Sequence, residues 1–169
     1  FNLYGLNNFK KQNRRDLILV EGYMDVIALN NNGIEIAVAS LGTAFTIEQA
    51  KLAKRYADSI YICYDSDTAG IKATKRAIEI FREAEIGVNI IELEDGLDPD
   101  DFVKKYGRDA FEKKMDEALD EYNYLYTQIL KGYSDANENE KFEKLNLFIN
   151  FLASIKQELT REIFINKVS

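Results

Sequence analysis

Two aspartates, Asp65 and Asp67, stand one residue apart directly after the apolar run 60–64. Because two nearby carboxylates repel each other and each resists losing its water, such a pair needs a compensating positive charge. Divalent cations such as Mg²⁺ take oxygen ligands, so a cation held by these two side chains is the natural compensation. The D-x-D pattern alone is a weak signal, because it also occurs in surface loops, glycosyltransferases and phosphotransferases.

Other acidic residues also follow apolar runs. Glu21 follows the run 17–20, and the segment 94–101, "EDGLDPDD", follows another run and contains Asp98 and Asp100. A single acid in a loop is unremarkable, but here acids recur after three expected strands. The recurrence predicts a cluster of carboxylates where the strands end.

Such a cluster suits phosphoryl-transfer chemistry. Two divalent ions about 4 Å apart can activate an attacking oxygen and stabilise a leaving one. Asp65 and Asp67 can supply two ligands, and Glu21 can bind an ion or serve as a general base or acid. Gly22 and Gly70, which stand beside these acids, would allow the backbone to come close to a ligand.

Strand and helix signals alternate from residue 17 to residue 100, which is typical of parallel strands joined by right-handed crossovers. In such open sheets, ligands bind beyond the carboxyl ends of the strands. The sequence predicts an α/β domain over 17–100. We expect strands at 17–20, 34–40, 59–65 and 87–94, and helices at 23–33, 45–57 and 69–85.

The two flanking segments have a different texture. Residues 1–16 are polar with a basic cluster, and we expect a solvated lead-in helix or linker from an upstream core. Residues 101–169 show helical patterns only, which predicts a small helical subdomain. Its expected core positions recur at helical spacing: Phe142, Leu145, Phe148, Leu152, Ile155 and Leu159.

Composition excludes several kinds of chemistry. The 169 residues contain no histidine and a single cysteine, Cys63, so no histidine-dependent mechanism and no Cys/His zinc site can form within the chain. The net charge of −7 argues against unaided binding to nucleic acid. No apolar run is long enough to span a membrane. Because the sequence does not begin with Met, we interpret it as a fragment of a longer protein.

Four segments together resemble the TOPRIM region of bacterial DnaG-type DNA primases. They are "LVEGYMDVIAL", "AVASLGTAFT", "YDSDTAGIKATKRA" and "DGLDPDDFV", in this order, and the resemblance covers about residues 17–106. The segments 3–6 and 161–169 resemble the flanking primase sequence more loosely. The resemblance implies a TOPRIM-type open, mainly parallel sheet flanked by helices, followed by a small all-helical subdomain.

The resemblance also implies an activity. Enzymes of this family are nucleotidyltransferases, DNA-directed RNA polymerases that make short RNA primers on a single-stranded DNA template for replication. They use ribonucleoside triphosphates and Mg²⁺, for which Mn²⁺ can substitute. The implied partners are the template, the nucleotides, the RNA primer and, in the full-length protein, the replicative helicase, in the bacterial cytoplasm and away from membranes. We expect little or no primer synthesis from this segment alone.

The same resemblance implies site residues. Glu21, Asp65 and Asp67 match the catalytic acids, and together with Asp98 and Asp100 they match the metal-binding set. The residues expected near the site are Gly22, Asp25, Ser40, Gly42, Thr43 and Gly70.

Four other functions stay open at this point. A topoisomerase-type D-x-D-x-x-G-E signature would need glutamate where this chain has Ile71, and a haloacid-dehalogenase-type D-x-D-x-T signature would need threonine at Ala69. A TOPRIM nuclease or a non-catalytic TOPRIM binding module is also compatible with the motifs. A metal titration separates the binding module from the enzymes, and a DNA cleavage assay separates the primase from the nuclease or topoisomerase.

Overall fold

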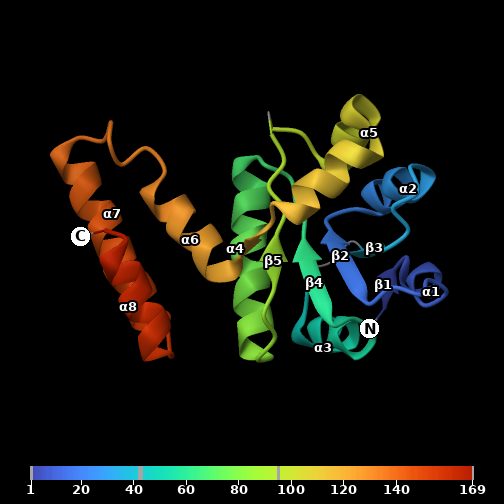
Figure 1. Ribbon diagram of the computed structural model, residues 1–169, viewed down its shortest axis with the longest axis horizontal. Coiled ribbons are helices and arrows are strands. Elements are labelled where there is room, and N and C mark those ends of the chain that lie inside the picture. Colours follow the sequence, from blue (N-terminus) through green and yellow to red (C-terminus); the bar gives the residue numbers. More distant parts are fainter. Residues whose placement is uncertain (1, 42–43, 95, 169) are drawn as a thin grey trace. The chain divides into compact units, whose positions relative to one another are not determined.

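Six short strands form one sheet in the computed structural model, which describes residues 2–41, 44–94 and 96–168 (Figure 1). The strands are β1 (Leu3–Tyr4), β2 (Asp16–Val20), β3 (Ala37–Ser40), β4 (Ser59–Ile62), β5 (Asn89–Ile90) and β6 (Leu119–Asp120). Their order in space is β1-β3-β2-β4-β5-β6. The four inner strands are parallel, whereas β1 and β6 are antiparallel to their neighbours.

The centre of the sheet is β2, whose sequence "DLILV" is apolar at four consecutive positions. Leu19 pairs with Val38 of β3 on one side and with Ile62 of β4 on the other. All three side chains are buried, as expected for a parallel strand that is covered by helices on both faces.

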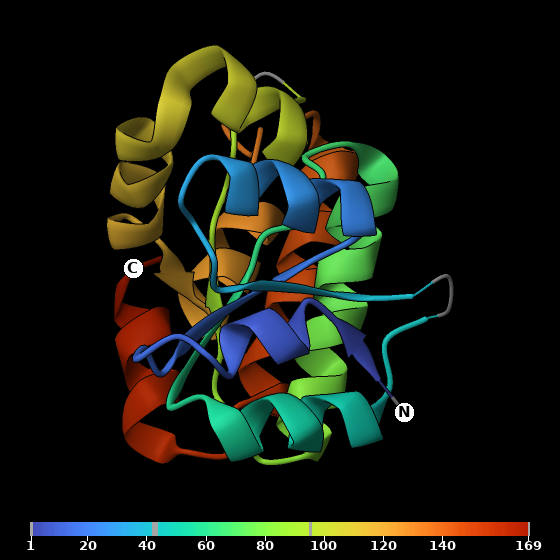
Figure 2. The same ribbon diagram turned by 90° about the vertical axis from the view of Figure 1, so that its right-hand side faces the viewer.

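Five helices accompany the sheet: α1 (Leu6–Phe9), α2 (Tyr23–Asn31), α3 (Ile47–Tyr56), α4 (Thr68–Glu83) and α5 (Pro99–Asp116). α2 packs beside α5, and α3 packs beside α4 (Figures 1 and 2). The connection through α2 runs from β2 to β3, whereas the connections through α3 and α4 run across the sheet in the opposite direction. Because such crossovers are right-handed, α2 lies on one face of the sheet, and α3 and α4 lie on the other. The predicted fold class, a mainly parallel sheet flanked by helices, is confirmed.

The first 16 residues differ from the expected solvated lead-in. β1 adds an antiparallel edge strand to β3, and Leu3 pairs with Ser40. Leu6 and Phe9 of α1 are each only 2% exposed, so the segment belongs to the core of the α/β unit. The sequence did not predict this burial because Leu3, Leu6 and Phe9 lie among many polar residues. Three apolar residues are too few to give a clear periodic pattern.

The structure also places the domain boundary differently from the expected position at residue 100. The chain divides into one unit over residues 1–121 and another over 122–169. α5 belongs to the first unit because it packs on α2, and β6 pairs with β5 within a stretch where only helices were expected. Gly107, with φ of 82°, interrupts the helical geometry inside α5.

The second unit consists of helices around an aromatic cluster. α6 spans Glu121–Leu130, α7 spans Glu138–Ser154 and α8 spans Glu158–Asn166. The cluster consists of Phe148, Phe151, Ile155 and Phe164, with Tyr126 packed against it. None of the helices in the described ranges is both long and apolar enough to span a membrane.

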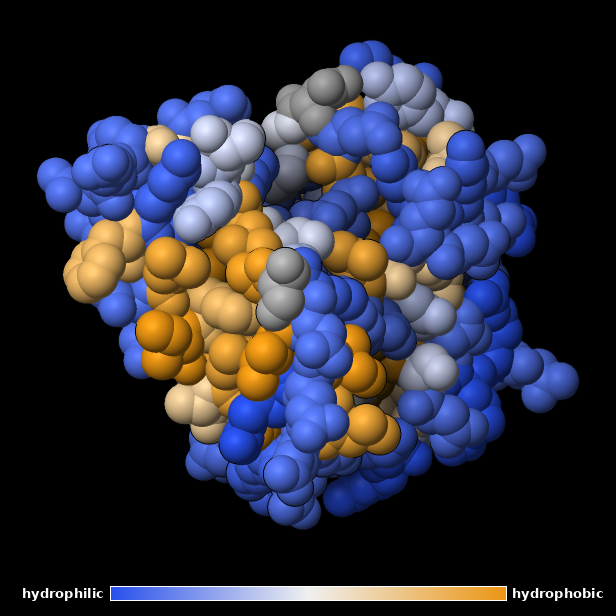
Figure 3. All heavy atoms as spheres, turned by 60° about the vertical axis from the view of Figure 1, so that its left-hand side comes forward, coloured by the Kyte–Doolittle hydropathy of each residue, from blue (hydrophilic) through white to orange (hydrophobic). Residues whose placement is uncertain are grey.

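Only part of the predicted helical core is buried. Phe148 and Ile155 are buried as expected, but Phe142 is 66% exposed and Leu159 is 72% exposed. These positions do not lie on one helix, because α7 ends at Ser154 and α8 begins at Glu158, so a single periodic stripe cannot describe both helices. Figure 3 shows apolar side chains at the surface of the molecule.

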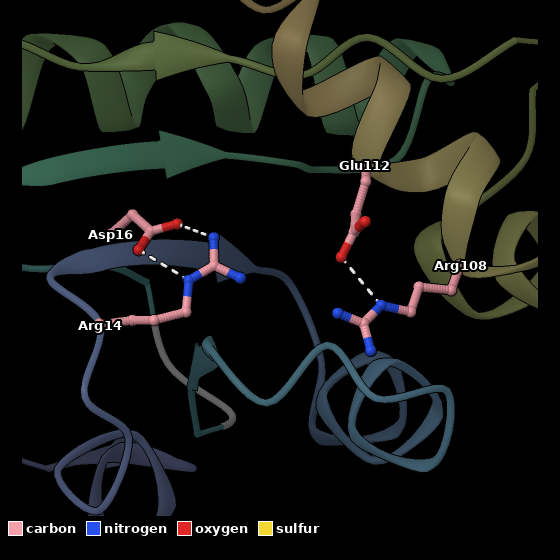
Figure 4. Close-up of polar contacts among 4 residues, drawn as sticks. All are labelled: Arg14, Asp16, Arg108 and Glu112. Carbon is pink, nitrogen blue, oxygen red and sulfur yellow. Dashed lines mark hydrogen bonds and ion pairs between the residues drawn. The ribbon is translucent and has the colours of Figure 1, made fainter.

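Exposed ion pairs lie at the end of the sheet where the parallel strands begin, and each contributes little to stability there because its charges are solvated. The Arg14 guanidinium donates to the carboxylate of Asp16 at the start of β2, and Arg108 donates to Glu112 on α5 over 2.8 Å (Figure 4). Arg15 likewise pairs with Asp58, just before β4. Two residues of the basic lead-in, Arg14 and Arg15, therefore pair with carboxylates at this end of the sheet.

We predict that Phe9→Ala lowers the free energy of unfolding by about 3–5 kcal/mol, because it removes a fully buried ring and leaves a cavity. The matched control is Met24→Ala, which truncates a half-exposed side chain and should change the value by less than about 0.5 kcal/mol. Urea unfolding measures both values. Equal effects of the two substitutions would contradict the placement of α1 in the core.

Candidate metal centre

The acidic residues after β2 and β4 lie at the point where the sheet changes direction. β2 and β4 are neighbours, yet the chain leaves β2 toward β3 on one side and leaves β4 toward β5 on the other. In open α/β sheets, this divergence leaves a crevice at the carboxyl ends of the two strands. Glu21 follows β2 directly, and Asp65 follows β4 after two residues.

A hydrogen bond connects these two acidic residues. The backbone amide of Asp65 donates to Oε1 of Glu21 over 3.2 Å. The ladder between the strands continues to this point, since the amide of Cys63 donates to the carbonyl of Leu19 over 2.9 Å. The backbone therefore fixes the position of the Glu21 carboxylate against the loop that carries Asp65 and Asp67.

The turn from Asp65 into α4 depends on a glycine. The amide of Gly70 donates to Oδ1 of Asp67 over 2.7 Å, so Asp67 is the N-cap of α4. A Cβ atom at Gly70 would lie only 2.0 Å from the carbonyl oxygen of Asp65. We expected glycine here to let a ligand approach the backbone. In the structure, glycine is needed because the backbone of the loop itself occupies the space where a side chain would lie.

Asp98 and Asp100 lie at the start of α5. Asp98 is the N-cap of this helix and accepts a hydrogen bond from the amide of Asp101 over 2.7 Å. Lys104, one turn further along, lies 2.8 Å from the Asp100 carboxylate. Ser66 donates a hydrogen bond to the carbonyl of Leu97 over 3.3 Å, which ties this loop to the loop of Asp65 and Asp67.

Asp25 completes the acidic cluster from the first turn of α2. Its Oδ2 accepts a hydrogen bond from the amide of Gly22 over 3.0 Å, and the amide of Asp100 also donates to this carboxylate. The side chain is only 7% exposed. Gly22 is the N-cap of α2 in extended geometry, so it belongs to the same turn.

The cluster makes ionisation of its members difficult. Burial raises the pKa of Asp25 to about 6, and the charges of Asp98 and Asp65 add to this effect. Burial and the charge of Asp65 raise the pKa of Glu21. The pKa of Asp65 is also raised, first by burial and then by the charges of Asp98 and Asp67. Negative charge thus accumulates here with little compensation from the protein.

The donor set fits a hard divalent cation, because every candidate ligand offers carboxylate oxygen. Among the described residues, Lys104 is the only cation that forms an ion pair with one of these carboxylates. Across residues 2–41, 44–94 and 96–168, however, no three acidic or thiol side chains converge closely enough to hold an ion as they stand. Binding would therefore require some of the side chains to rotate.

The structure brings the predicted acids into one neighbourhood through the contacts above. Ser40 ends β3 and lines a cleft together with Glu21. Gly42 and Thr43, which were expected near the site, lie outside the described residues.

Sequence reasoning missed two residues that organise the site. The role of Ser66 as a link to Leu97 has no local sequence signal, because the two residues come from different loops. The pairing of Lys104 with Asp100 could have been found, since the two stand four residues apart on an expected helix.

We predict that Gly70→Ala destabilises the protein by about 1–3 kcal/mol, because the new methyl group collides with the backbone of Asp65. Gly87→Ala is the matched control, since a Cβ there meets no atom within 4 Å. Urea unfolding of both variants gives the comparison. A Gly70→Ala variant as stable as the control would refute the tight packing of this turn.

A second prediction concerns pH in the absence of metal. The Asp25 carboxyl titrates near 3.8 when unfolded and near 6 when folded, so the folded state binds more protons between these values and wild-type stability falls as pH rises through them. Asp25→Asn lacks this titration and should become more stable than the wild type by up to about 3 kcal/mol above pH 6. Urea unfolding in EDTA at a series of pH values measures the difference. A difference that stays constant from pH 4 to pH 8 would contradict it.

Known proteins are similar to this chain over most of its length. The family model described as Toprim-like matches residues 18–103. The DNA primase of Clostridium acetobutylicum is 43% identical over 172 aligned residues, which cover 99% of this chain and 28% of that primase. The chain thus spans less than a third of the length of this curated relative.

Solved structures show the same similarity. A DNA primase domain from Pseudomonas aeruginosa superposes with a TM-score of 0.77 at 35% identity, covering 99% of this chain and 54% of that one. A DnaG primase catalytic domain bound to ssDNA superposes with a TM-score of 0.76 at 32% identity, covering 98% of this chain and 55% of that one. The sheet, its acidic strand ends and the matched family model lead to one conclusion: this chain belongs to the Toprim-like family and corresponds to the TOPRIM part of DnaG-type primases.

Proposed function

We propose that this chain supplies the metal-bearing site of a DNA primase, an RNA polymerase that makes short RNA primers on single-stranded DNA from ribonucleoside triphosphates. The observation that supports this most directly is the gathering of carboxylates at the carboxyl ends of neighbouring parallel strands. The similarity to a DNA primase over 99% of the chain supports the proposed reaction class. In the longer protein, the replicative helicase would be a partner at the replication fork in the bacterial cytoplasm.

The residues that would hold Mg²⁺, or Mn²⁺ in its place, are Glu21, Asp65, Asp67, Asp98 and Asp100. Bound there, the metal would supply positive charge to the phosphates and lower the pKa of the attacking hydroxyl. Asp67 and Asp98 each use Oδ1 to cap a helix, so Oδ2 of each is the oxygen that we assign to a ligand.

Glu21 can also act as a general base. The Asp65 amide bonds to Oε1, which leaves Oε2 to accept a proton from a hydroxyl in the crevice. Burial and neighbouring charge raise the pKa of this carboxylate, which makes it a stronger base than an ordinary glutamate. Asp25 lies deeper and is held by backbone amides, so we assign it the positioning of the loops rather than contact with substrate.

The direct test is a calorimetric titration of Mn²⁺ into the chain. Wild type should bind saturably, and the double variant Asp65→Asn with Asp67→Asn should lose this binding, because amides are weaker ligands than carboxylates. Asparagine also caps helices well, so the start of α4 is preserved. The matched control changes Asp109 and Asp116, two exposed acids on α5, to Asn.

The outcomes separate the candidate functions. Binding that is lost only in the Asp65 and Asp67 variant supports the site, whereas equal binding by all three proteins, or none by wild type, contradicts it. Metal-dependent cleavage of DNA by the chain would favour a nuclease over a primase. We expect little or no primer synthesis from these 169 residues alone, and a primer-extension assay with labelled nucleotides measures this directly.

A further inference from the structure

A cleft of about 360 Å³ lies beside the acidic cluster. Glu21 forms part of its wall, together with Ser40 at the end of β3 and Tyr64 just after β4. α4 also lines the cleft and contributes Lys72 and Arg76. The cleft therefore runs from the candidate metal centre to two cationic side chains that the acidic site itself does not use.

Lys72 and Arg76 are charges without a partner in the described part of the chain. They stand four residues apart and so occupy the same face of α4, where two like charges repel each other. Both are exposed, and neither forms a hydrogen bond or ion pair with another described residue. Arg82 near the end of the same helix, by contrast, donates to Glu121 over 2.8 Å.

A phosphate-bearing ligand would relieve this repulsion. The net charge of the chain is −7, and the neighbouring carboxylates repel phosphates, so any nucleic acid near the metal centre must be held by cations at its margin. One helical turn separates Lys72 from Arg76, about 6 Å along the axis, which is similar to the repeat of a sugar-phosphate backbone. Phe45, Ala73 and Ile80 add apolar surface suited to sugars and bases.

We infer that Lys72 and Arg76 contact successive phosphates of a single DNA strand and guide it along the cleft past Glu21. This inference rests on the proposed primase function, but the contact itself requires no metal. Phosphate contacts position a strand without reading its sequence, so the pair should act on strands of any sequence.

The test measures binding of a fluorescein-labelled oligo(dT) to the whole chain by fluorescence anisotropy, in EDTA and at several salt concentrations. Lys72→Gln and Arg76→Gln are each compared with Lys75→Gln, which removes the same charge from an exposed residue on the same helix that does not line the cleft. We expect the first two variants each to bind about five to ten times more weakly at about 50 mM salt and to lower the salt dependence of log K by about 0.7. Lys75→Gln should leave both quantities nearly unchanged.

Three results would overturn the inference. The first is no binding by wild type at low salt, and the second is an equal loss in all three variants, which would mean diffuse electrostatic attraction. The third is weaker binding of ATP with Mg²⁺ by Arg76→Gln while the oligonucleotide binds as before, because the pair would then serve the incoming nucleotide. Oligonucleotide binding through this pair without any Mn²⁺ binding would refute the metal centre and leave the inference standing.

Discussion

The mutual repulsion of carboxylates at the strand ends is the constraint on which this molecule depends. Glu21, Asp25 and Asp65 each have a pKa raised first by burial and then by the charges of neighbouring aspartates. Left to themselves, such groups would move apart into water. They stay together because a buried parallel sheet sets the positions of their loops, and because backbone amides donate to several of the carboxylates.

The loops achieve this with short-range geometry. Asp67 and Asp98 each begin a helix, so the same side chains that cap α4 and α5 also carry negative charge toward the crevice. Ser66 joins the two loops, and the absence of a side chain at Gly70 allows the turn to close on Asp65. The opposite end of the sheet is built differently, since its exposed arginines and aspartates neutralise each other in pairs.

The parallel core and the grouping of the acids could be predicted from the sequence, because apolar runs followed by carboxylates are local patterns. Local spacing also shows where α3 begins, since Thr46 and Gln49 stand three residues apart and form a capping box there. The lead-in strand and β6 were missed because two-residue strands are defined by their partners rather than by their own sequence. The sequence also could not distinguish buried Phe148 from exposed Phe142. Both belong to one apolar stripe, and only the contacts of that stripe with other helices decide which side chain is buried.

The two short edge strands also affect how the chain meets other molecules. β1 and β6 close the sheet with only two residues each, and both run against the direction of the four inner strands. A long free edge invites another chain to add a strand and begin aggregation, and short edges deny it a template. The apolar parallel core therefore ends, on each side, in an edge too short to serve as a template for strand addition.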